Sequence, residues 1–145
     1  MSRIPRYQLD GRLHHVTTRA TGGNALFVDD DDRAYFMGLL RRCVGRFGWT
    51  CHAYCLMGTH YHLIVEADLE HLSRGMHRLN GLYAAAFNDR HRRRGRLLAD
   101  RFASVVLLDE AHYSAACEYV LQNPVKAGLR TRAVDWPWSG FGLSA

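Results

Sequence analysis

The sequence of 145 residues lacks the features that would assign it to several specialised classes of protein. No window approaches the roughly 18 consecutive apolar residues of a membrane span, and the N-terminal segment lacks the apolar core of a signal peptide. The four cysteines form no CxxC pair, which argues against a zinc ribbon and a redox motif. We therefore expect a cytoplasmic protein, not associated with a membrane, whose thiols are reduced and mostly buried.

Lysine is almost absent, because Lys126 is the only lysine among 19 basic residues. The net charge of +5 and the pI near 9.3 favour a polyanionic partner such as nucleic acid. Arginine suits bidentate phosphate contacts, although a GC-rich coding bias would explain its excess equally well. The clustering is more informative, since six arginines fall within a dozen residues: Arg90, Arg92, Arg93, Arg94, Arg96 and Arg101.

The spacing of apolar residues predicts the order β-α-β-β-α-β followed by one more helix. Strands are predicted at 13–19, 49–57, 61–66 and 101–108, and helices at 30–47, 69–92 and 109–122. Gly75 and Gly81 weaken the second helix, and Pro124 predicts that the third ends near Asn123. The aromatic tail after residue 134 is expected to dock on the core.

This order predicts an α+β fold in a single domain over residues 1–145. A hairpin in the middle, with helices between the other strands, favours a four-stranded antiparallel sheet of ferredoxin-like order (βαββαβ) with helices on one face. The last predicted helix, which carries Tyr119, is added to this arrangement.

Two histidines flank a tyrosine at the start of the third predicted strand. Because side chains alternate along a strand, His60 and His62 project to one face and Tyr61 to the other. Their Cα atoms would be about 6.5 to 7 Å apart, from which two imidazoles can converge on one metal ion. The alternative is that one histidine caps the turn and the other faces solvent.

The third predicted helix carries a second candidate group. On a helical wheel Tyr119 and Asn123 share one stripe that flanks the apolar face, so the helix could pack on the sheet and still present a phenol and an amide. The simpler interpretation is a tyrosine at the border of an amphipathic helix and an asparagine that ends it.

Taken together, these segments closely resemble the single-tyrosine HUH transposases, and within that superfamily the REP-associated tyrosine transposases. The resemblance covers residues from about 3 to 141 and rests on HVTTR, LMGTHYHLIVE, HRRRGRLLADRF, RFASVVLLD, EYVLQNPVKAGL and WPWS. It implies that His60 and His62 are metal ligands, that Asn123 is the third, and that Tyr119 is the catalytic nucleophile. The chain departs from the usual pattern at Gly58 and Thr59, where MPNH is common, and at Glu118, where an arginine is usual.

The resemblance implies a transposase that nicks and rejoins single-stranded DNA, often with hairpins, through a 5′-phosphotyrosine intermediate. Mg²⁺ or Mn²⁺ would polarise the scissile phosphate. The arginine cluster, together with Arg19, would bind the DNA backbone, although a solvated charge run is the alternative. The protein would be a monomer or a homodimer.

Two other functions remain open at this point. A domesticated relative could bind DNA hairpins without cutting them. A zinc hydrolase could use the two histidines and a metal-bound water, with no role for Tyr119.

Overall fold

The computed structural model of the protein describes residues 11–145, so residues 1–10 of the predicted domain lie outside it. Within this range the chain forms five strands and three α-helices with two short 3₁₀ turns. In chain order they are β1 (Leu13–Arg19), η2 (Thr21–Gly23), α1 (Asp30–Phe47), β2 (Thr50–Leu56), β3 (His60–Glu66), α2 (Leu69–Arg90), β4 (Ala103–Val106), α3 (Glu110–Lys126), η3 (Ala133–Asp135) and β5 (Ser139–Leu143). No helix among residues 11–145 is long and apolar enough to cross a membrane.

Each long helix begins at an aspartate that caps its N-terminus. The carboxylates of Asp29, Asp68 and Asp109 accept hydrogen bonds from backbone N–H groups three residues further on, which would otherwise lack partners. Gly48 ends α1 in the left-handed conformation with φ of 65°, which glycine adopts without a steric penalty. Local sequence therefore fixes where these helices begin.

The sheet is antiparallel throughout and has the strand order β4-β1-β3-β2-β5. The first four strands reproduce the predicted ferredoxin-like order, and the predicted α+β class is confirmed. The sheet has five strands rather than four, because the C-terminal tail forms β5 and pairs with the free edge of β2. Any extended segment that reaches this edge can pair with it through its backbone. The sequence analysis therefore predicted only that the tail docks on the core, and not that it forms a strand.

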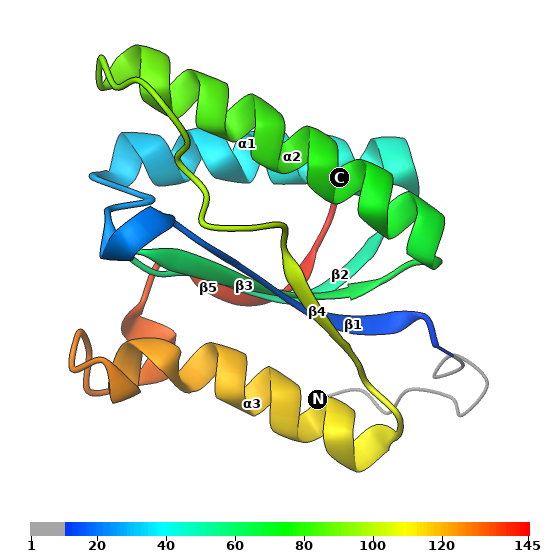
Figure 1. Cartoon of the computed structure of the whole chain (residues 1–145). Helices are drawn as coiled ribbons and strands as arrows, with labels where there is room; N and C mark the ends of the chain where they lie inside the picture. The colour runs from blue at the N-terminus through cyan, green and yellow to red at the C-terminus, as the bar shows by residue number, and fades with distance from the viewer. Residues whose placement is uncertain (1–10) are drawn as a thin grey trace.

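The helices lie on both faces of the sheet (Figure 1). α1 and α2 cover one face, and α3 covers the other. Two hydrophobic clusters match these layers: Phe36 and Tyr61 belong to the α1 and α2 side, whereas Ile64 and Val120 belong to the α3 side. Side chains of alternating strand positions therefore face two different cores.

The prediction that α3 ends near Asn123 is wrong, because the helix continues through Pro124 to Lys126. Proline inside a helix removes one backbone donor and crowds the carbonyl four residues earlier. Here only one turn remains: the N–H of Ala127 donates to Asn123 at 3.0 Å and that of Leu129 donates to Pro124 at 2.9 Å. Pro124 itself is buried, so its ring contributes to packing.

Candidate active site

The two histidines of β3 lie on the face of the sheet that α3 covers. His62 is 2% exposed and His60 is half-buried, with their ring centroids 5.0 Å apart. Tyr61 points to the opposite layer, where it is 1% exposed and donates a hydrogen bond to Asn80 at 2.6 Å. The alternation expected from the sequence is confirmed, and Tyr61 is a core residue.

α3 brings Tyr119 and Asn123 to these histidines from almost sixty residues further along the chain. The Tyr119 ring lies edge-on to His62 with centroids 5.6 Å apart, and 43% of the residue remains exposed. The Asn123 amide nitrogen donates to the backbone oxygen of Tyr119 at 2.9 Å, and its side chain is near enough to His60 to oppose the lowering of that imidazole's pKa. The stripe predicted on the helical wheel thus faces the histidine pair.

The surroundings keep both histidines neutral near pH 7. Burial lowers the pKa of His62 to about 3, helped by the neighbouring His15, His60 and Arg19. Burial and the charge of Arg19 also lower the pKa of His60. A neutral imidazole is the protonation state that a metal ligand needs.

Two further residues of the site come from β1 and escaped the sequence analysis. His15 Nε2 lies 3.0 Å from His62 Nδ1, and Thr17 Oγ1 lies 3.1 Å from the same nitrogen. The His15 ring also lies edge-on to Tyr119, with centroids 5.8 Å apart. His15, Thr17 and Arg19 alternate along one face of a strand. This pattern could have identified them as neighbours of His62 only if the β1 and β3 register had been known.

Lys126, the only lysine of the chain, also belongs to this group. It lies two helical turns after Tyr119, and its Nζ is 4.9 Å from the centroid of the phenol ring. The spacing of seven residues could have predicted this neighbour, since it returns to the same helical face. A cation therefore stands beside the phenol.

The donor set fits a divalent cation held by two imidazoles and an amide. His62 Nε2 is buried and has no hydrogen-bond partner among residues 11–145, so its lone pair is available to a ligand. Among residues 11–145, no group of three His, Cys, Asp or Glu side chains could hold a metal ion. A third protein ligand would therefore have to be of another type, as Asn123 is.

The cysteines play no part in this site. All four are buried and free, as predicted, and burial raises the pKa of Cys51 and Cys55 to about 12. A register shift in β2 between Cys51 and Ala53 places Cys51 in one core and Cys55 in the other. The two thiols thus face opposite layers.

The predicted DNA-binding arginines fall into three groups. Arg19 lies opposite His60 in the strand register and is exposed at the site. Arg90 is held by carboxylates at the start of α1, with Nη1 2.7 Å from Asp29 and 2.6 Å from Asp32, so its charge is already paired. The others follow α2 in the loop and the segment leading to β4: Arg92, Arg93, Arg94, Arg96 and Arg101.

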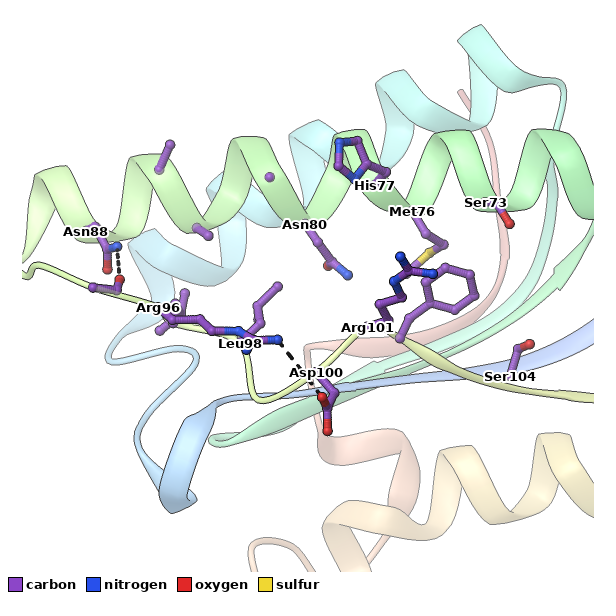
Figure 2. Close-up of a pocket in the computed structure, with 16 residues that line it drawn as sticks. Ser73, Met76, His77, Asn80, Asn88, Arg96, Leu98, Asp100, Arg101 and Ser104 are labelled. Carbon is purple, nitrogen blue, oxygen red and sulfur yellow. Dashed lines mark hydrogen bonds and ion pairs between the residues drawn. The ribbon is translucent and has the colours of Figure 1, made fainter.

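Two of these arginines line a groove between α2 and residues 95–104 (Figure 2). The groove has a volume of about 660 Å³, and Arg96 and Arg101 border it opposite Asn80 and His77 of α2. Among residues 11–145 the ion pair of Arg96 is a long one, with Asp100 at 4.0 Å, and both side chains are exposed. The groove lies on the α2 side of the sheet, whereas Tyr119 lies on the α3 side.

Comparisons with known proteins agree with this architecture. No family model matches the sequence, and no curated protein gives a significant match. Among solved structures, a REP-associated tyrosine transposase bound to a REP hairpin superposes with a TM-score of 0.74. The chain has the fold of a REP-associated tyrosine transposase. The match covers 96% of this chain and 82% of that transposase at 17% identity, so the likeness to the transposase is one of fold.

Proposed function

We propose that the protein is a metal-dependent transposase that nicks and rejoins single-stranded DNA, with Tyr119 as nucleophile. The observation that carries this proposal is the meeting of Tyr119 and Asn123 with His60 and His62 at one point of the sheet. A phenol can serve as the nucleophile, and two neutral imidazoles and an amide can hold a divalent cation that assists phosphoryl transfer. The transposase fold of the chain supports the same conclusion.

The chemistry starts with attack by the Tyr119 oxygen on a DNA phosphorus. A new bond joins that oxygen to phosphorus, the bond to the 3′ oxygen breaks, and the proton lost by the phenol is balanced by the one gained by the leaving 3′-hydroxyl. The product is a 5′-phosphotyrosine of similar energy to the phosphodiester, so a 3′-hydroxyl can reverse the step without ATP.

We assign the cation site to His60, His62 and Asn123, with Mg²⁺ or Mn²⁺ as the ion. Mixed nitrogen and oxygen ligands suit Mn²⁺, and cellular abundance favours Mg²⁺. When bound, the ion polarises the scissile phosphate and offsets charge that develops on it. The protein residues contribute a dry, neutral and oriented ligand set, because burial keeps the imidazoles unprotonated.

Single-stranded DNA flanked by hairpins is the substrate class that we propose. The exposed arginines lie on both sides of the sheet, with Arg19 at the candidate site and Arg96 and Arg101 along the α2 groove. Such an arrangement supports binding of a strand at Tyr119 together with a second DNA segment along α2. Tyr119 acts on the site of its own chain, since one protomer already brings it beside His62.

The test is formation of a covalent adduct between the protein and labelled single-stranded DNA from the flanks of its gene, with and without Mn²⁺. Wild type is expected to form an adduct only with Mn²⁺ or Mg²⁺, and Tyr119→Phe is expected to form none while it still binds DNA. An adduct that persists in Tyr119→Phe contradicts the assignment. Metal-dependent cleavage without an adduct, unaffected by the substitution, supports a water nucleophile instead.

A hairpin-binding protein that does not cleave is the second candidate function. It is favoured by the absence, among the described residues, of a third acidic, histidine or cysteine ligand at the site. Tight hairpin binding without cleavage under any divalent metal would establish this alternative.

A further inference from the structure

The two ring nitrogens of His62 have different surroundings. Nδ1 lies 3.0 Å from His15 Nε2 and 3.1 Å from Thr17 Oγ1, so it has two hydrogen-bonding neighbours. Nε2 is buried and has no hydrogen-bond partner in the described part of the chain. Only one of these nitrogens can carry the proton of a neutral imidazole, so the neighbours decide which one does.

The two placements of the proton differ in cost. A proton on Nε2 would leave a buried donor without an acceptor, which costs about 1 to 3 kcal/mol. A proton on Nδ1 can be donated to His15 Nε2 or to Thr17 Oγ1, and it leaves the Nε2 lone pair free. The second placement is also the one in which Nε2 can bind a cation.

Both neighbours stand on a strand that has little freedom to move. β1 lies inside the sheet between β3 and β4, and Thr17 is directly opposite His62 in the register. Val16 between them is 0% exposed in the opposite core, which holds the strand at this point. His15 is further confined by the rings of His62 and Tyr119, with centroids 5.1 Å and 5.8 Å away.

We propose that His15 and Thr17 are positioning residues that hold His62 with its proton on Nδ1, so that the Nε2 lone pair faces the cation. The consequence for metal binding rests on the proposed function. The tautomer itself is a property of the metal-free protein and can be measured without metal or DNA. When His15 Nε2 is the acceptor, His15 carries its own proton on Nδ1.

Four variants test this arrangement. His15→Phe keeps an aromatic ring against Tyr119 but removes the acceptor, and Thr17→Val removes the hydroxyl at nearly constant volume. The double variant leaves His62 Nδ1 without either neighbour. His15→Gln restores an acceptor near the position of Nε2, and the exposed strand residue Thr50 provides Thr50→Val as a matched control.

The first measurement is the imidazole ¹⁵N spectrum of the metal-free protein, with His62 assigned by comparison with His62→Gln. Wild type, Thr50→Val and His15→Gln are expected to show the proton on Nδ1, and the double variant is expected to lose this preference. The second measurement is Mn²⁺ affinity by titration calorimetry. The affinity should fall about 10-fold to 100-fold in the double variant, and the single variant His15→Gln should bind Mn²⁺ as wild type does.

The outcomes separate this inference from the proposed function. A wild-type spectrum with the proton on Nε2 overturns the inference even if every variant fails to fold. A folded double variant that keeps both the tautomer and the Mn²⁺ affinity also overturns it. If wild type binds no Mn²⁺, the proposed metal-dependent function fails, while the wild-type spectrum still decides the tautomer.

Discussion

Gly75 and Gly81 lie on the same helix and should respond in opposite ways to substitution by alanine. Both are inside α2, where glycine costs about 1 kcal/mol relative to alanine. Helix propensity alone therefore predicts that each substitution stabilises the protein. Their surroundings differ, because a Cβ at Gly81 would meet nothing within 4 Å, whereas one at Gly75 would lie 2.2 Å from Cζ2 of Trp49.

Trp49 has little room to move away from a methyl group at position 75. It is 4% exposed, and its indole nitrogen donates to the backbone oxygen of His71 at 3.1 Å. Overpacking costs about 1 to 3 kcal/mol, and loss of the hydrogen bond would add about 1 kcal/mol. After the gain of about 1 kcal/mol in helix propensity, Gly75→Ala should lower the free energy of unfolding by about 1 to 3 kcal/mol.

Urea denaturation and thermal melting of both variants test this reasoning. Gly75→Ala should lower the melting temperature by roughly 3 to 10 °C, and Gly81→Ala should leave it unchanged or raise it by a few degrees. Trp49 fluorescence should change only in Gly75→Ala. A Gly75→Ala variant as stable as wild type would show that the indole is not fixed against α2 and would refute the argument.

Two further predictions follow from charged and titratable groups. The hydrogen bond from Arg90 holds the pKa of Asp29 below its usual 3.8, so this pair stabilises the fold above about pH 4 and loses its effect as the pH falls further. Arg90→Gln should therefore lower the melting temperature at pH 7 more than at pH 3, whereas Arg94→Gln, in an exposed loop, should change it little at either pH; equal losses at both pH values would contradict the ion pair. Because burial raises the pKa of Cys51 and Cys55 to about 12, iodoacetamide at pH 8 should label neither in the native protein and both in urea, and rapid native labelling located by mass spectrometry would contradict their burial.

Much of the fold could be predicted because its signals are local. The aspartate caps, the left-handed Gly48 and the alternation at His60, Tyr61 and His62 each depend on a few neighbouring residues. The end of α3 could not, since a buried Pro124 is tolerated only because the last turn finds other backbone partners. The fifth strand was missed for a similar reason, because pairing with β2 depends on where the tail arrives.

The candidate site likewise has features that local spacing predicted and features that depend on contacts between distant residues. Spacing alone placed Tyr119 and Asn123 on one helical stripe and two histidines on one strand face. It did not assign Arg90 to the carboxylates of α1, because that contact joins residues about sixty positions apart. His15 and Thr17 likewise became visible as neighbours of His62 only through the β1 and β3 register.

The sequence by itself determined the positions of the helices apart from the end of α3, the first four strands, and the shared strand face of His60 and His62, because periodicity and capping act over a few residues. Only the tertiary structure decided that α3 packs on the face opposite α1 and α2 and that β5 pairs with the β2 edge. It also decided that, within residues 11–145, His62 has two hydrogen-bonding neighbours on one ring nitrogen and none on the other. These features depend on packing and on strand register between segments that are distant in the sequence. Packing and register therefore set the distances between Tyr119 and the histidines of the site.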